Sequence, residues 1–136
     1  MVGIYADQVL QPKETYLTDL ADALEIMQQN VDLMENNNSV FVKELSWGSE
    51  RREEYKHVDL ILLTDVLYNQ SSHDLLLDTL DWLLENENSR ALLSYKERNP
   101  DEREFFEKVK TRGWSIQKTK GIIDNPMFEI YWLFKK

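Results

Sequence analysis

One short segment constrains the fold of this chain more than any other. Residues 58–63 read Val-Asp-Leu-Ile-Leu-Leu and are nearly continuous in apolar side chains. Strands of this kind lie inside parallel sheets, where helices cover both faces and few side chains meet water. The segment therefore predicts a buried parallel strand, and with it an α/β architecture.

The rest of the chain alternates between strand and helix patterns. Strands are predicted at residues 15–18, 39–45, 58–63, 90–95, 114–120 and 128–134. The last two pair antiparallel across residues 121–126, and Phe128, Ile130, Trp132 and Phe134 alternate along the final one. We expect a Rossmann-like, doubly wound α/β sheet with an antiparallel C-terminal hairpin, in one domain over residues 1–136.

Three helices are expected between these strands. One carries an apolar stripe, a second begins at Ser71 or Ser72, and a third begins at Asn99 as cap followed by Pro100. Glycine ends the third helix at Gly113, since glycine readily takes the left-handed backbone conformation. The inward-facing residues are predicted to be Leu20, Leu24, Met27, Val31 and Met34, then Leu76, Leu80, Leu83 and Leu84, then Phe105, Phe106 and Val109.

Composition excludes several classes of function. The 136 residues contain no cysteine and only two histidines, which argues against disulfides, thiol catalysis and a metal cluster. A net charge of −9 argues against nucleic-acid partners, because phosphate binding needs a basic surface. No apolar run is long enough to span a membrane, so a cytoplasmic protein is expected. The acidic surface favours basic partners, or it serves solubility alone.

Polar and aromatic residues follow the predicted strands where such sheets bind ligands. Asp19 closes one strand and can accept hydrogen bonds from ribose hydroxyls, while Trp47 beside Gly48 offers a flat face for an adenine. Asp65 follows the buried strand and is expected to point into a partly desolvated cleft, with Tyr68 three residues later. Structural alternatives stay open: Asp19 as a helix cap, Trp47 and Tyr68 as packing residues, and Asp65 as a loop cap.

Four strings in this order and spacing carry a family resemblance: LTDL at 17–20, ELSWG at 44–48, DLILLTDVLY at 59–68 and LLSYKERNPDEREFFE at 92–107. Together they resemble the seven-strand (class I) S-adenosylmethionine-dependent methyltransferases. Within these, they resemble the group that methylates lysines of non-histone proteins such as chaperones and translation factors. The resemblance extends through the closing strand at 129–136.

The resemblance implies S-adenosyl-L-methionine as cofactor and a protein with an accessible lysine as substrate. By position, Asp19 matches the residue that holds the cofactor ribose, and Trp47 matches the aromatic at the adenine. Asp65 and Tyr68 match the D-x-x-Y motif beside the methyl-transfer site, where Asp65 also attracts the cationic cofactor. Ser94, Tyr95 and Arg98 fall in a neighbouring family segment and receive no role.

One departure from the family pattern matters. Met1-Val2-Gly3 falls inside or just after the glycine-rich loop of the family, so we expect an N-terminally truncated domain that lacks the first strand and this loop. The strands beside the missing one would then carry unpaired backbone groups, and a partner protein that completes the sheet would satisfy them. Two other functions stay open: a non-catalytic interaction module built on the truncated fold, and a methyltransferase acting on small molecules.

Overall fold

A computed structural model describes residues 2–119 and 127–135, which form two compact units. The first unit covers Met1–Ser46 and the second covers Trp47–Lys136. Each unit has its own strands and helices and is described by itself below. Among the described residues, no helix is both long enough and apolar enough to cross a membrane.

The first unit is a two-stranded parallel sheet with two helices. Its elements are α1 (Val2–Leu10), β1 (Thr15–Asp19), the 3-10 turn η1 (Ala21–Ala23), α2 (Leu24–Asp32) and β2 (Val40–Glu44). Thr15 lies opposite Val40, and Asp19 lies opposite Glu44. Few side chains are buried: Val31 on α2, Val40 on β2 and Leu45 just after it. No residue of α1 is buried.

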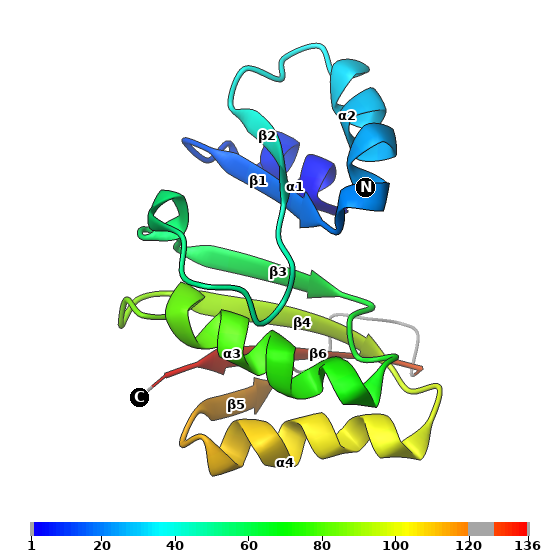
Figure 1. The fold of residues 1–136 in the computed structure, drawn as a ribbon, viewed down its shortest axis with the longest axis vertical. Coiled ribbons are helices and arrows are strands. Elements are labelled where there is room, and N and C mark those ends of the chain that lie inside the picture. Colours follow the sequence, from blue (N-terminus) through cyan, green and yellow to red (C-terminus); the bar gives the residue numbers. More distant parts are fainter. Residues whose placement is uncertain (1, 120–126, 136) are drawn as a thin grey trace. The chain divides into compact units, whose positions relative to one another are not determined.

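The second unit is a four-stranded mixed sheet with strand order β3-β4-β6-β5. β3 and β4 are parallel, whereas β4, β6 and β5 pair antiparallel. Figure 1 shows α3 and α4 on the same face of this sheet. Its elements are η2 (Glu53–Tyr55), β3 (Leu60–Thr64), η3 (Gln70–Ser72), α3 (His73–Leu83), β4 (Arg90–Lys96), η4 (Pro100–Arg103), α4 (Glu104–Thr111), β5 (Ser115–Lys118) and β6 (Phe128–Phe134).

The core of the second unit lies between its sheet and these two helices. Alternate residues of β4 point into it, and Ala91, Leu93 and Tyr95 are all buried. Period-two alternation is expected for a strand with only one fully covered face. The helices contribute Leu76, Leu77, Leu80 and Leu84, and Phe105, Phe106 and Val109. This packing fixes the C-terminal ends of β3 and β4 beside one another.

Most expected elements are confirmed. The antiparallel C-terminal region, the parallel β3–β4 pair and the buried residues Phe105, Phe106 and Val109 are as predicted. The predicted connection at 121–126 lies outside the described residues. In the described part of the chain the strands form two sheets, because β1 and β2 pair only with each other.

Two details of the helices differ from the sequence prediction. The predicted serine cap before α3 is wrong: Asn69 accepts the hydrogen bond from the backbone N–H of Ser71, and Ser72 makes no cap. The stripe predicted on the first helix is also mostly unburied, since Val31 alone is buried and Leu20 is exposed. The Asn99 cap and the left-handed Gly113 are confirmed.

Backbone amides of the first unit are expected to exchange with solvent faster than those of the second. A two-stranded sheet with a small core opens at low free-energy cost, while β4 is hydrogen-bonded on both sides over a large core. Hydrogen–deuterium exchange by mass spectrometry should show protection roughly tenfold or more lower in β1 and β2 than in β4 and β6. Equal protection in the two units would contradict this account.

Candidate functional site

A small cavity lies at the C-terminal ends of β3 and β4, within the second unit. Its enclosed volume is only about 10 Å³, room for about one water molecule. In open α/β sheets, ligands bind outside these strand ends, where loops rather than helices meet the sheet. The cavity is lined by Asp65, Leu67, Tyr68, Tyr95, Lys96, Arg98 and Glu102.

Asp65 has an unusual backbone and a paired side chain. Its φ of 58° lies in the left-handed region, which Asp tolerates better than most residues with a side chain. Arg98 Nη2 donates a hydrogen bond to Asp65 Oδ2 at 2.9 Å and lies 2.8 Å from Oδ1. The Asp65 side chain is 63% exposed. The sequence predicted a partly desolvated carboxylate, whereas the structure has an exposed one that an arginine neutralises.

A buried histidine anchors the loop between Asp65 and α3. His73 is completely buried at the first position of α3, and its Nε2 lies 3.0 Å from the Leu67 carbonyl oxygen. Its ring also meets Phe105 edge to face, with centroids 5.4 Å apart. Leu67 is buried, whereas Tyr68 next to it is 65% exposed. The loop is therefore anchored at Leu67, and Tyr68 extends from the anchored point toward solvent.

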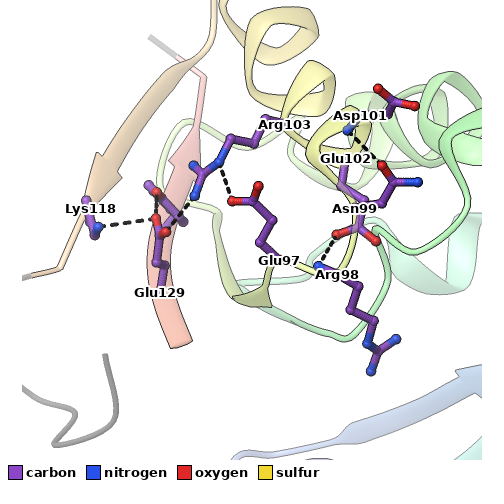
Figure 2. A network of polar contacts seen from close by, with 9 residues as sticks. Glu97, Arg98, Asn99, Asp101, Glu102, Arg103, Lys118 and Glu129 are labelled. Carbon is purple, nitrogen blue, oxygen red and sulfur yellow. Dashed lines mark hydrogen bonds and ion pairs between the residues drawn. The ribbon is translucent and has the colours of Figure 1, made fainter. Parts of the chain in front are cut away.

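Two buried polar side chains form the inner part of the cavity. Glu102 is 4% exposed, and its Oε2 accepts the backbone N–H of Arg98 at 3.1 Å (Figure 2). Tyr95 is 3% exposed, and its hydroxyl lies close enough to the Glu102 carboxylate to hydrogen-bond to it. Burial, and then the nearby negative charge of Glu102, raise the pKa of Tyr95 above its ordinary value.

A charged network fastens the segment after β4 to the C-terminal hairpin. The Arg103 guanidinium donates to Glu97 at 2.6 Å and to Glu129 at 2.8 Å, and Lys118 lies 3.2 Å from Glu129 (Figure 2). Tyr131 also donates to Glu129. Burial alone would raise the pKa of Glu129, but the hydrogen bonds from Tyr131, Arg103 and Lys118 lower it to about 2.

Trp47 and Gly48 form a second feature of this unit. Trp47 is half-buried and packs against the core. Gly48 has φ 82°, and a Cβ there would lie 2.6 Å from Leu75 Cδ2. Its N–H donates to the Thr79 hydroxyl at 2.8 Å. The glycine is thus required locally, and it fixes the backbone beside the tryptophan ring.

Asp19 lies in the first unit, at the end of β1. Its side chain is exposed, and Oδ1 accepts the backbone N–H of Leu20 at 2.7 Å. The alternative role as a helix cap is wrong, because η1 begins with no side-chain cap. One carboxylate oxygen occupied by the backbone leaves the second available to a hydroxyl donor, which fits the chemistry expected of a ribose-binding residue.

Of the predicted site residues, Asp65 and Tyr68 line the same cavity, and Trp47 lies outside its lining. The sequence analysis missed the pairing of Asp65 with Arg98, the buried Glu102 and the anchoring His73. Glu102 follows Asn99 and Pro100, where acidic residues usually face solvent beside a helix N-terminus. Its sequence position therefore gave no signal of burial.

The chain has clear sequence relatives. A family profile described as lysine methyltransferase matches residues 1–112. The protein N-terminal and lysine N-methyltransferase EFM7 of Candida glabrata is 32% identical over 132 residues, covering 86% of this chain and 51% of that protein. The protein-lysine N-methyltransferase EFM6 of Saccharomyces cerevisiae is 29% identical, covering 87% and 50%. The chain thus spans about half the length of these relatives.

Solved structures agree on the fold. The methyltransferase domain of bacterial CtHen1-C aligns with a TM-score of 0.63 at 13% identity, covering 98% of this chain and 84% of that one. PigF with SAH aligns with a TM-score of 0.68 at 15% identity, covering 96% and 45%. At these identities the match concerns the fold alone, which is the class I methyltransferase fold.

The network around Glu129 predicts a specific acid dependence of stability. The folded-state pKa of about 2 is below the ordinary value of 4.5, so the stabilisation is present above pH 4.5 and is lost as the pH falls toward 2. Glu129→Gln should remove this component, on the order of 2 kcal/mol of unfolding free energy after allowance for solvent screening. Urea unfolding at several pH values measures it.

The exposed carboxylate of Glu107 provides the control for loss of one negative charge, as Glu107→Gln. If the Glu129→Gln protein loses stability between pH 4.5 and 2 as steeply as the unsubstituted chain, the network does not have the assigned role.

Proposed function

This chain belongs to the lysine methyltransferase family, and from that premise we propose that it takes part in S-adenosylmethionine-dependent methylation of lysine side chains in proteins. The family profile covers residues 1–112, which include both units' parallel strands. The single observation that carries the proposal is the joint placement of Asp65 and Tyr68 on one cavity at the end of β3. Both residues of the D-x-x-Y string are therefore available to the same ligand.

The proposed substrates are translation factors. Two of the relatives are named as lysine methyltransferases EFM6 and EFM7, and one of Xenopus tropicalis, 32% identical over 94 residues, is named EEF1A lysine methyltransferase 3. The net charge of −9 supports attraction of a lysine-bearing, basic segment. We assign the substrate class as a non-histone protein with an accessible lysine.

Three residues are proposed to hold the cofactor. The half-buried Trp47 ring suits a planar base, and the second oxygen of Asp19 suits a ribose hydroxyl. Asp65, whose charge Arg98 offsets, would contribute a hydrogen-bond acceptor to the cofactor. Bound S-adenosylmethionine supplies an electrophilic methyl group.

The residues of the cavity would align the attacking amine. Methyl transfer to nitrogen needs little covalent participation from the protein, so orientation supplies most of the acceleration. Arg98 holds the Asp65 carboxylate in one position, and His73 holds Leu67. The loop that carries Asp65 and Leu67 is therefore fixed at both residues. Tyr68 extends from this loop and would orient the amine through its hydroxyl.

A second candidate function rests on a separate observation. In the described part of the chain β1 pairs only with β2 and β3 pairs only with β4, and several apolar side chains of α1 are exposed. A protein that adds a strand or covers α1 would satisfy these groups. The chain would then act as an interaction module. Recovery of a stable complex by size-exclusion chromatography, without methyl transfer, would favour this role.

Asp65→Asn is expected to lower methyl transfer by roughly 100-fold or more, because it preserves shape but breaks the ion pair with Arg98 that holds this residue in position to orient the reactants. The assay incubates the chain with radiolabelled S-adenosylmethionine and purified translation elongation factors, and locates the label by mass spectrometry. Binding of S-adenosylhomocysteine should be largely retained. Asp59→Asn, an exposed residue beside β3, is the matched control and should remain active.

Unchanged transfer by the Asp65→Asn protein would refute the role of Asp65. Label in small solutes rather than in lysine residues would instead assign a small-molecule substrate.

A further inference from the structure

The strand β5 lies at one end of the second unit's sheet and pairs with β6 alone among the described strands (Figure 1). The Thr119 N–H donates to the Ile130 carbonyl at 2.9 Å, and the antiparallel register places Gln117 opposite Trp132. Because backbone groups alternate in direction along a strand, the N–H and C=O of Ile116 and Lys118 point away from β6. Within residues 2–119 and 127–135 these groups have no backbone partner, so this edge of the sheet is open.

A groove of about 250 Å³ lies directly beside this edge, between α4 and the β5–β6 hairpin. Its apolar lining is Phe106, Ile116 and Tyr131, and the Phe106 and Tyr131 ring centroids are 4.7 Å apart. Ile116 thus belongs to the groove through its side chain and to the open edge through its backbone. Small-molecule sites usually have about 300–1,000 Å³, so this smaller groove suits one or two side chains of an extended peptide.

The border of the groove is basic, although the chain as a whole has a net charge of −9. Residues 108–118 contain no Asp or Glu and four basic residues: Lys108, Lys110, Arg112 and Lys118. Lys110 lines the groove, and its ion pair with Glu107 is formed by side chains that are 57% and 71% exposed. Such a pair contributes little, so a ligand carboxylate can replace Glu107 as the partner of Lys110. This border therefore favours an acidic ligand.

The same charges argue against a second copy of the chain on this edge. Pairing β5 with another β5 would bring two basic borders together, and like charges facing each other across a strand pair are destabilising. Lysine on an edge strand has this effect in many sheets. An acidic strand from a different protein meets no such repulsion.

We propose that the open edge of β5 and the adjacent groove dock an extended acidic segment of a partner protein, which adds to β5 as a further strand. Ile116 and Lys118 provide the backbone N–H and C=O groups, and an apolar side chain of the segment enters the groove. Lys110 meets one of its carboxylates. None of the residues lining the groove lines the cavity at Asp65, so the inference is independent of the proposed methylation.

The probe is a fluorescein-labelled peptide, Asp-Thr-Val-Thr-Asp-Thr, whose valine and aspartates share one face when it is extended. Anisotropy measures its affinity for the 136-residue chain, and NMR follows the Ile116 and Lys118 amides. We expect saturable binding, with slowed hydrogen exchange at both amides. A peptide N-methylated on the backbone nitrogens that face β5 should bind roughly tenfold more weakly, because it cannot donate to the edge. A peptide with lysine in place of aspartate should not bind saturably.

Two variants of the exposed pair at the groove should change the affinity in opposite directions. Lys110→Gln removes the cation and should weaken binding roughly two- to fivefold, whereas Glu107→Gln removes the competing carboxylate and should strengthen it. Lys56→Gln and Glu53→Gln make the same charge changes in an exposed pair of the same spacing on η2. These two controls should bind the peptide as the unsubstituted chain does.

The proposal is overturned if the N-methylated peptide binds as well as the unmodified one, if Lys110→Gln leaves the affinity unchanged, or if the Ile116 and Lys118 amides do not respond. It is also overturned if the chain alone sediments as a dimer and these two amides shift on dilution, because a second copy would then occupy the edge.

Discussion

The one-sided burial of β4 determines most of what surrounds the candidate site. Ala91, Leu93 and Tyr95 point into the core beneath α3 and α4, and hydrogen bonds to β3 and β6 hold the strand on both sides. The last of the three is a tyrosine, so the apolar stripe ends in a hydroxyl at the strand end where ligands bind. The same packing that stabilises the unit thus places a polar group in the cavity.

Electrostatic pairing then shapes the loops on this frame. The Arg103 network ties the segment after β4 to β6, and Arg98 ties the same segment to Asp65 beyond β3. Exposed pairs of this kind contribute little to stability individually, and their effect here is to limit the positions of Asp65 and Glu102. A site that aligns reactants needs this restriction more than it needs a strong charge.

The sequence predicted the elements better than the environments of their side chains. The apolar run at 58–63 and the alternation at 128–134 identified two strands correctly, but the predicted burial of the first is wrong, since Leu63 alone of β3 is buried and Leu60 is exposed. The burial of Glu102 left no signal in the sequence: its position after Asn99 and Pro100 is where a solvated acid belongs. The Asp65–Arg98 pair joins residues 33 positions apart, and periodicity within a segment cannot reveal that contact.

The first unit illustrates a different limit. Its apolar stripe satisfied the helical period, yet Val31 alone is buried and Leu20 and Ile26 are exposed. Periodicity reports which residues share a face, and burial depends on what is packed against that face. The class I methyltransferase fold and the family were both reached from the strings at 17–20, 44–48, 59–68 and 92–107. The roles of Asp19, Trp47, Asp65 and Tyr68 stay predictions.

Calorimetric titration of the 136-residue chain with S-adenosylhomocysteine tests the central claim most directly. The account predicts saturable binding of one equivalent with a Kd in the micromolar range, weakened when Trp47 is replaced by alanine. The absence of binding by a sample whose circular dichroism shows it to be folded would contradict the claim that this chain forms a cofactor site.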